Sequence, residues 1–173
     1  MADLTFSTTE GQTIDRELLV AYLNTGTTSS PTWSAIGKRV ESSSEEMDWS
    51  TESSQDILGN TFTTMKKPTI TQSFDPLPLD AGDAAAVKIW NLAIKDHDVQ
   101  ALSNQDMLIA HLYASSGQAK FAERYTSCAI AVTSIGGDGG GTLEISTDIT
   151  YGGERTLGSV TESGGQVTFT ADT

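Results

Sequence analysis

The chain has 173 residues, and its 23 Asp and Glu against 10 Lys and Arg give it a formal net charge of -13 at pH 7. A chain of this length can bury a core without disulfides or structural metals, so we expect one domain over residues 1–173. The acidity argues against a protein that holds nucleic acid through phosphate contacts, because such binding depends on clustered Lys and Arg. It argues equally against docking on an anionic membrane.

Neither export nor disulfide formation is expected. The longest apolar run, residues 18–23, is too short to span a bilayer, and the first residues lack the basic start and apolar core of a signal peptide. Cys128 is the single cysteine, so no internal disulfide forms and no zinc-ligand spacing exists. Because Cys128 stands in an apolar strand pattern, we expect a buried structural thiol in a protein made in a reducing compartment.

The first half of the chain predicts strands joined by polar loops. Residues 1–13 are polar and without period, which indicates a flexible N-terminal segment. Gly59 and Asn60 tolerate positive φ, so they mark the turn of a long exposed hairpin, and residues 75–78 indicate a rigid extended link. Strand composition recurs at residues 16–23, 33–40, 47–53, 61–65 and 69–74.

One helix is predicted, over residues 83–96, with Asp80 or Asp83 as its N-cap. Apolar residues recur along it at three- and four-residue spacing, namely Ala86, Ile89, Trp90 and Ala93. After residue 104 the period changes to two, and strands are expected at residues 107–114, 120–135, 142–151, 156–162 and 166–171. The predicted fold class is mainly β, a sandwich or barrel of about seven to nine strands with one flanking α-helix.

The strand at residues 142–151 has the clearest alternation. Its predicted apolar side carries Leu143, Ile145, Ile149 and Tyr151. Its polar side carries Glu144, Ser146 and Asp148. Taken alone, that polar side is an ordinary solvent-exposed face.

No group of residues predicts catalysis. His111 alternates with apolar residues, which is typical of a core or interface histidine, and His97 lies at the end of the predicted helix. The acidic clusters lack the spacing of a calcium loop. The glycine loop at residues 136–141 lacks the Lys of a phosphate-binding loop and leads into a strand. We therefore expect no enzyme activity, no cofactor and no metal.

The order of several short phrases along nearly the whole chain resembles a known family. The phrases are Trp33-Ser34-Ala35-Ile36-Gly37, Asp56-Ile57-Leu58-Gly59, Lys67-Pro68-Thr69, Phe74-Asp75-Pro76, the acid-capped helix, Phe121-Ala122-Glu123-Arg124-Tyr125 and Tyr151-Gly152-Gly153. In this order they resemble the major tail proteins, or tail tube proteins, of long-tailed bacteriophages. The resemblance implies a structural subunit that closes into hexameric rings, and these rings stack into the conduit through which viral double-stranded DNA is ejected.

The resemblance also implies partners and a location. The main partner would be the chain itself, followed by other tail proteins such as the tape measure, the initiator and the terminator. DNA would pass through the tube without specific binding, and no membrane would be contacted. The protein would be made in the cytoplasm of the bacterial host and would reside in the tail of the virion.

Three segments acquire roles through the resemblance. The hairpin loop of residues 42–60 would extend onto the neighbouring ring, with Met47, Trp49, Ile57 and Leu58 as its anchors, unless these side chains fold back on their own domain. Residues 1–13 would become ordered only on assembly. The lumen would be lined by Glu144, Ser146 and Asp148, because acidic and hydroxyl side chains repel phosphates and let DNA slide.

Two other functions remain open. A tube protein of a phage-derived bacteriocin or secretion device would share the fold but carry no DNA. A monomeric β-sandwich module that binds carbohydrate or protein would present exposed aromatic side chains, whereas Trp33 and Trp90 stand in core-type patterns and Trp49 alone among the tryptophans looks free.

Overall fold

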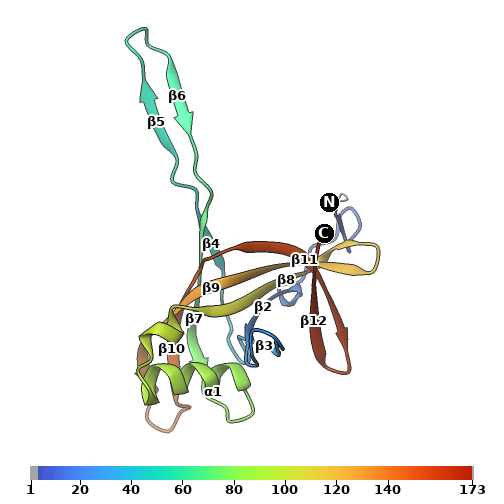
Figure 1. Ribbon diagram of the computed structural model, residues 1–173, viewed down its shortest axis with the longest axis vertical. Helices are drawn as coiled ribbons and strands as arrows, with labels where there is room; N and C mark the ends of the chain where they lie inside the picture. The colour runs from blue at the N-terminus through green and yellow to red at the C-terminus, as the bar shows by residue number, and fades with distance from the viewer. Residues whose placement is uncertain (1–3, 173) are drawn as a thin grey trace.

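The computed structural model describes residues 4–172, and in that part of the chain ten strands join into one antiparallel sheet (Figure 1). The strand order is β3-β2-β8-β9-β10-β7-β4, with β1 added to β8 and the β11–β12 hairpin added to β9. Strands β5 and β6 form a separate two-stranded ribbon. The bounds are β1 Thr5–Phe6, β2 Leu19–Asn24, β3 Trp33–Ala35, β4 Glu45–Asp48, β5 Glu52–Gln55, β6 Thr61–Thr64, β7 Thr69–Pro78, β8 Gln105–Ser116, β9 Ala119–Gly136, β10 Glu144–Tyr151, β11 Arg155–Ser163 and β12 Gln166–Ala171.

The long strand β9 belongs to two layers. Its first part pairs with β8 and β11, and its second part pairs with β10. Between β10 and β11 the chain turns a corner at Gly152 and Gly153, where Gly153 has a φ of 79°. A Cβ on Gly153 would lie 2.8 Å from the backbone nitrogen of Ser127, so a side chain there would collide with β9. The two glycines therefore let the sheet fold over into a sandwich.

The main core lies between the two layers and beneath the helix. Leu23 of β2, Leu77 of β7 and Ile89 of the helix are fully buried there, together with Met107, Ile109, Ile145 and Ile149. A second apolar cluster lies on the opposite face of the β2–β8–β9–β11 layer. Its members are Tyr22, Trp33, Leu108, Ala110, Ala122 and Val160, and Val167 and Phe169 of β12 pack against them. The mainly β fold with one flanking helix, predicted from the sequence, is confirmed, but the described residues form twelve strands where seven to nine were predicted.

The predicted helix at residues 83–96 is also confirmed. It consists of α1 Ala84–Trp90 and a π-helical turn η2 Asn91–Lys95, followed by the short α2 Val99–Leu102; a 3-10 turn, η1 Arg16–Leu18, precedes β2. Of the two predicted caps, Asp83 is the one used, because its carboxylate accepts hydrogen bonds from Ala85 N and Ala86 N at 3.0 and 3.1 Å. Asp80 instead binds Lys38 Nζ at 2.9 Å.

Several predicted strand bounds were wrong. Residues 16–18 form η1, and the strand predicted at 33–40 ends at Ala35. Residues 75–78 continue β7 instead of forming a link, because a register shift opposite β10 accommodates Pro76 without interrupting the pairing of Leu77 with Ile145. Leu143 precedes β10 and is 52% exposed, so it does not belong to the buried side of that strand. Thr147 takes a buried place there.

At the N-terminus, Thr5 and Phe6 pair with Ser115 and Ala114 of β8. Residues 1–3 of the predicted flexible segment 1–13 lie outside the described residues, and ordering of the segment on assembly remains a prediction. Cys128 is fully buried, as predicted, and burial raises the pKa of its thiol to about 11. A thiol of this kind is unreactive at neutral pH.

A long hairpin projects from the body of the molecule (Figure 1). At its base β4 pairs with β7, and beyond that pairing the β5–β6 ribbon continues outward. We call residues 49–66 the arm. Each side of the arm has about nine residues, which corresponds to about 30 Å in extended conformation.

Candidate assembly surfaces

The arm has no core of its own. Every residue of β5 and β6 is exposed, and the two strands are paired only with each other. Local contacts across the ribbon are polar, such as the Ser53–Thr63 hydroxyl contact at 3.1 Å and the exposed Lys66–Glu52 ion pair. An isolated two-stranded hairpin is at best marginally stable in water. The arm therefore has little stability of its own beyond the pairing of its two strands.

The tip of the arm is held in one shape by Asp56. One oxygen of its carboxylate accepts hydrogen bonds from Leu58 N and Asn60 N at 2.9 and 2.8 Å, and the other accepts one from Asn60 Nδ2 at 2.9 Å. These hydrogen bonds lower the pKa of Asp56, so its carboxylate is charged at neutral pH. Gly59, with a φ of 85°, completes the turn. The turn predicted at Gly59 and Asn60 is thus formed.

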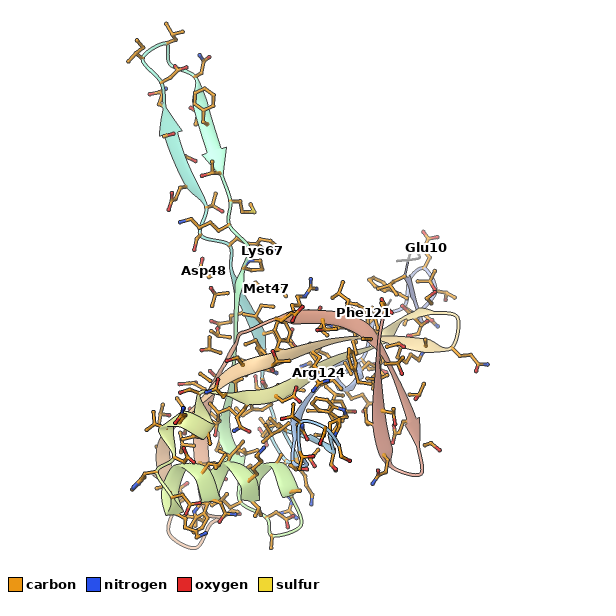
Figure 2. The ribbon with its side chains drawn as sticks, viewed as in Figure 1. Glu10, Met47, Asp48, Lys67, Phe121 and Arg124 are labelled. Carbon is orange, nitrogen blue, oxygen red and sulfur yellow. The ribbon has the colours of Figure 1, made fainter. Side chains whose placement is uncertain are left out.

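The four predicted anchors are exposed in the single chain. At the tip Ile57 is fully exposed and Leu58 is 81% exposed, while Met47 and Trp49 near the arm's base are about half-exposed. Figure 2 shows Met47 and Asp48 at that base beside Lys67 of the opposite segment. None of the four folds back into the core of its own chain.

Sequence reasoning missed two further apolar side chains on the arm, Phe62 and Met65, which are more than half-exposed. The strand predicted at residues 61–65 contains both, but their Thr-rich surroundings gave no sign of which face they would occupy. The strand register of the arm places Phe62 on the same face of the ribbon as Ser54, its partner in β5. With them, the arm and its base present six large apolar residues to solvent.

A buried polar cluster lies beneath the base of the arm. The carboxylate of Glu123 in β9 accepts a hydrogen bond from Tyr125 Oη at 2.7 Å and pairs with Arg155 Nε at 2.7 Å and His111 Nε2 at 3.2 Å. Burial acts to raise the pKa of Glu123, but the hydrogen bonds from Arg155 and Tyr125 and the proximity of His111 outweigh it and lower the pKa to about 2. This network contributes stability above the ordinary carboxyl pKa of 4.5, which is lost as the pH falls toward 2.

Glu45, the first residue of β4, borders the same cluster. Its Oε1 is buried and has no hydrogen-bond partner among the described residues. Burial raises its pKa, the nearby His111 and Arg16 act to lower it, and Glu123 acts to raise it. Because the folded state disfavours the charged carboxylate, Glu45 costs stability at neutral pH, and this cost disappears when the pH falls and the group is protonated.

The outward face of the β4–β7–β10–β9 layer is polar and acidic. The predicted lumen residues Glu144, Ser146 and Asp148 alternate with the buried Ile145, Thr147 and Ile149, so they share this face. The pairing register extends the face to Ser73 and Asp75 of β7 and to Glu46 of β4. Hydrogen bonds of 2.6 Å join Ser73 to Asp148 and Ser146 to Asp75, and Ser134 of β9 donates to Ser146 at 2.8 Å.

This face extends beyond the three residues predicted from the sequence. Glu46, Asp48 and Asp75 were missed because their place on it depends on strand pairing and on the register shift in β7. Neither Lys nor Arg occurs in β4, β7, β10 or residues 129–136 of β9. The face therefore carries carboxylates and hydroxyl groups with no cation among its own strands, which makes it a surface that repels phosphate.

The described residues contain no group of three or more His, Cys, Asp or Glu side chains that could hold a metal ion. Within the same residues, none of the helices is both long enough and apolar enough to cross a bilayer. His111 and Cys128 are held in structural contacts, with His111 Nδ1 2.9 Å from Tyr113 Oη and Cys128 Sγ 3.6 Å from the carbonyl oxygen of Tyr125. Two surfaces suited to contacts with macromolecules, the arm and the acidic face, are well defined in the described residues.

A solved structure with a similar fold is known, although its sequence differs widely from this one. A search of family models and a search of curated proteins gave no match. The chain resembles the sheath/tube terminator of an extracellular contractile injection system, PVC, in its extended state, with a TM-score of 0.53 and 11% identity over 86% of this chain and 99% of that one. The PVC sheath-tube complex gives a TM-score of 0.49 at 11% identity, with 87% and 95% of the two chains covered. The tube terminating cap of the anti-feeding prophage gives 0.49 at 15% identity, with 88% and 95% covered.

Proposed function

We propose that this chain is a structural subunit of a tail tube, which self-assembles into stacked hexameric rings and forms the conduit for viral double-stranded DNA. The observation that carries the proposal is the arm, an extension of about 30 Å that presents large apolar side chains without a core. Exposed apolar side chains of this kind are unfavourable in a monomer, and their burial against a second copy stabilises the assembly. The fold shared with a sheath/tube terminator supports the same role.

In this assembly the arm of one ring lies on the next ring. Met47, Trp49, Ile57 and Leu58, with Phe62 and Met65, supply the apolar centre of that contact, and the polar residues of the ribbon form its rim. Other tail proteins, namely a tape measure, an initiator and a terminator, bind the same stack at its core and ends. The protein then resides in the virion tail and has no catalytic role.

The acidic face lines the lumen in this proposal. Glu144, Ser146 and Asp148, joined by Ser73 and Asp75, present negative charge and hydroxyl groups toward the DNA. A polyanion moving through the tube needs a wall without cations, because Lys and Arg would bind phosphates and release counterions. The DNA passes without specific binding.

The deciding experiment is negative-stain electron microscopy of the purified chain over a range of concentrations, with light scattering on the same samples. Rings or hollow tubes are expected. A chain that stays monomeric at every concentration, even with tube ends added as nuclei, contradicts the proposal and favours the binding module. Ring symmetry is measured from end-on views in the same images.

A second candidate is a tube component of a phage-derived device that carries no DNA. The observation that favours it is the likeness of the fold to a terminator of an extracellular contractile injection system. The two candidates differ in what the tube contains. Particles purified from cells are digested externally with nuclease and assayed for protected DNA; protected DNA supports the viral tail, and its absence from intact particles supports the device.

A further inference from the structure

The structure contains an apolar groove that is distinct from both surfaces described above. It has a volume of about 790 Å³ and lies beside the second apolar cluster, between β2, β8 and the β11–β12 hairpin. Its walls are formed by Leu18, Tyr22, Leu112, Lys120, Val160 and Val167. The groove is open to solvent, and within the described residues no segment of the chain fills it.

We propose that this groove receives the tip of the arm from a second copy of the chain, with Ile57 and Leu58 inserted against Tyr22, Leu112 and Val167. This inference rests on the proposed self-assembly and adds the place of contact. The tip has the matching chemistry, since two exposed aliphatic side chains stand at the end of a turn that Asp56 already holds in shape. Because the tip is already folded, it loses little conformational freedom when it is inserted.

The arrangement of the two features suits a head-to-tail contact. In Figure 1 the arm and the β11–β12 hairpin point in opposite directions from the body of the molecule. The tip of the arm lies far from the β11–β12 hairpin of its own chain, whereas copies that stack in the same orientation can bring each tip to a groove of the next copy.

The charges are also complementary. Asp56 is the single charged residue of the tip, and Lys120, on the groove wall, has no carboxylate within 4.0 Å among the described residues. The other charged residue on the groove is Glu162. Burial raises the pKa of Tyr22, and the negative charge of Glu162 raises it further. The tip should therefore enter with Asp56 toward Lys120 and away from Glu162, which fixes its orientation.

Disulfide cross-linking of assembled tubes tests the proposal. The variant carrying Leu58→Cys and Val167→Cys is polymerised and oxidised mildly, and the products are separated without reductant. The two positions lie on oppositely directed hairpins, so bonds form between copies, and the native Cys128 is fully buried. The matched control pairs Leu58→Cys with Val99→Cys, an exposed apolar position on α2.

A ladder of covalent oligomers from the groove pair, with none from the control pair, is the expected result. Tubes that form without a ladder, or with equal ladders in both variants, overturn the groove contact and leave the tube function standing. Failure of the unmodified chain to assemble overturns both. Lys120→Glu, whose fold is checked by thermal unfolding of the monomer, provides a second measurement. It should raise the concentration needed for assembly severalfold, whereas Glu162→Lys should lower it, and equal effects of two folded variants would contradict the assigned orientation.

Discussion

Removing the apolar tip of the arm should separate assembly from folding. In the double variant Ile57→Ser with Leu58→Ser, two side chains that are almost completely exposed in the monomer become polar. Exposed substitutions of this kind change the free energy of unfolding by about 0.5 kcal/mol or less. The folded monomer should thus be retained with an unchanged melting temperature.

The effect on assembly should be large. Burying a Leu or Ile side chain contributes about 1.5–3 kcal/mol, so losing both costs about 3–5 kcal/mol for each arm contact, given that Leu58 is already partly covered. Since about 1.4 kcal/mol corresponds to a tenfold change in an equilibrium constant, the critical concentration for tube formation should rise by a factor of about 100 to 4,000.

Light scattering over a concentration series measures this critical concentration, and thermal unfolding followed by circular dichroism checks the monomer. Val99→Ser is the matched control, because Val99 is 73% exposed and lies on α2, outside the arm. An unchanged critical concentration would refute the assembly role of the tip. A clear loss of melting temperature in the double variant would show instead that the tip stabilises its own domain.

Three further outcomes are expected. Glu144→Lys with Asp148→Lys should leave tube formation intact but impair DNA delivery, and normal infectivity of the reconstituted virion would remove these residues from the lumen. Asp83→Ala removes the N-cap of α1, so thermal unfolding should show a loss of about 1 kcal/mol, and an unchanged stability would contradict the capping role. Glu45→Gln should stabilise the monomer at about pH 8 and have little effect at about pH 4, because the raised pKa of Glu45 leaves the carboxyl group mostly protonated there. If the variant and the unmodified chain have the same denaturation midpoint at pH 8 as well as at pH 4, a buried charge on Glu45 is excluded.

The sequence predicted the elements better than their ends. The helix was predictable because Ala86 and Ile89 follow its period and Asp83 is a strong cap. The strand through residues 75–78 was not, since two prolines normally end a strand and the register shift that accommodates Pro76 depends on β10, far away in the sequence. Tertiary pairing, which no local pattern contains, decides such cases.

Of the candidate surfaces, too, one part could be predicted from the sequence and the rest could not. The apolar tip at Ile57 and Leu58 was visible in the sequence, because aliphatic residues in a polar hairpin stand out. The extent of the acidic face was not, because Asp75 joins Ser146 and Asp148 joins Ser73 only through the pairing of β7 with β10. The groove was equally hidden, since it is built from segments as distant as Leu18 and Val167.

A head-to-tail contact between arm and groove has a consequence for the length of the tube. An isologous contact uses up both surfaces and closes, whereas a heterologous one leaves a free arm at one end and a free groove at the other after every addition. Growth by insertion of Leu58 into the groove of the next copy therefore has no end point of its own. On this reasoning tube length must be set by another component, which either measures the tube or covers the exposed arms or grooves at its end.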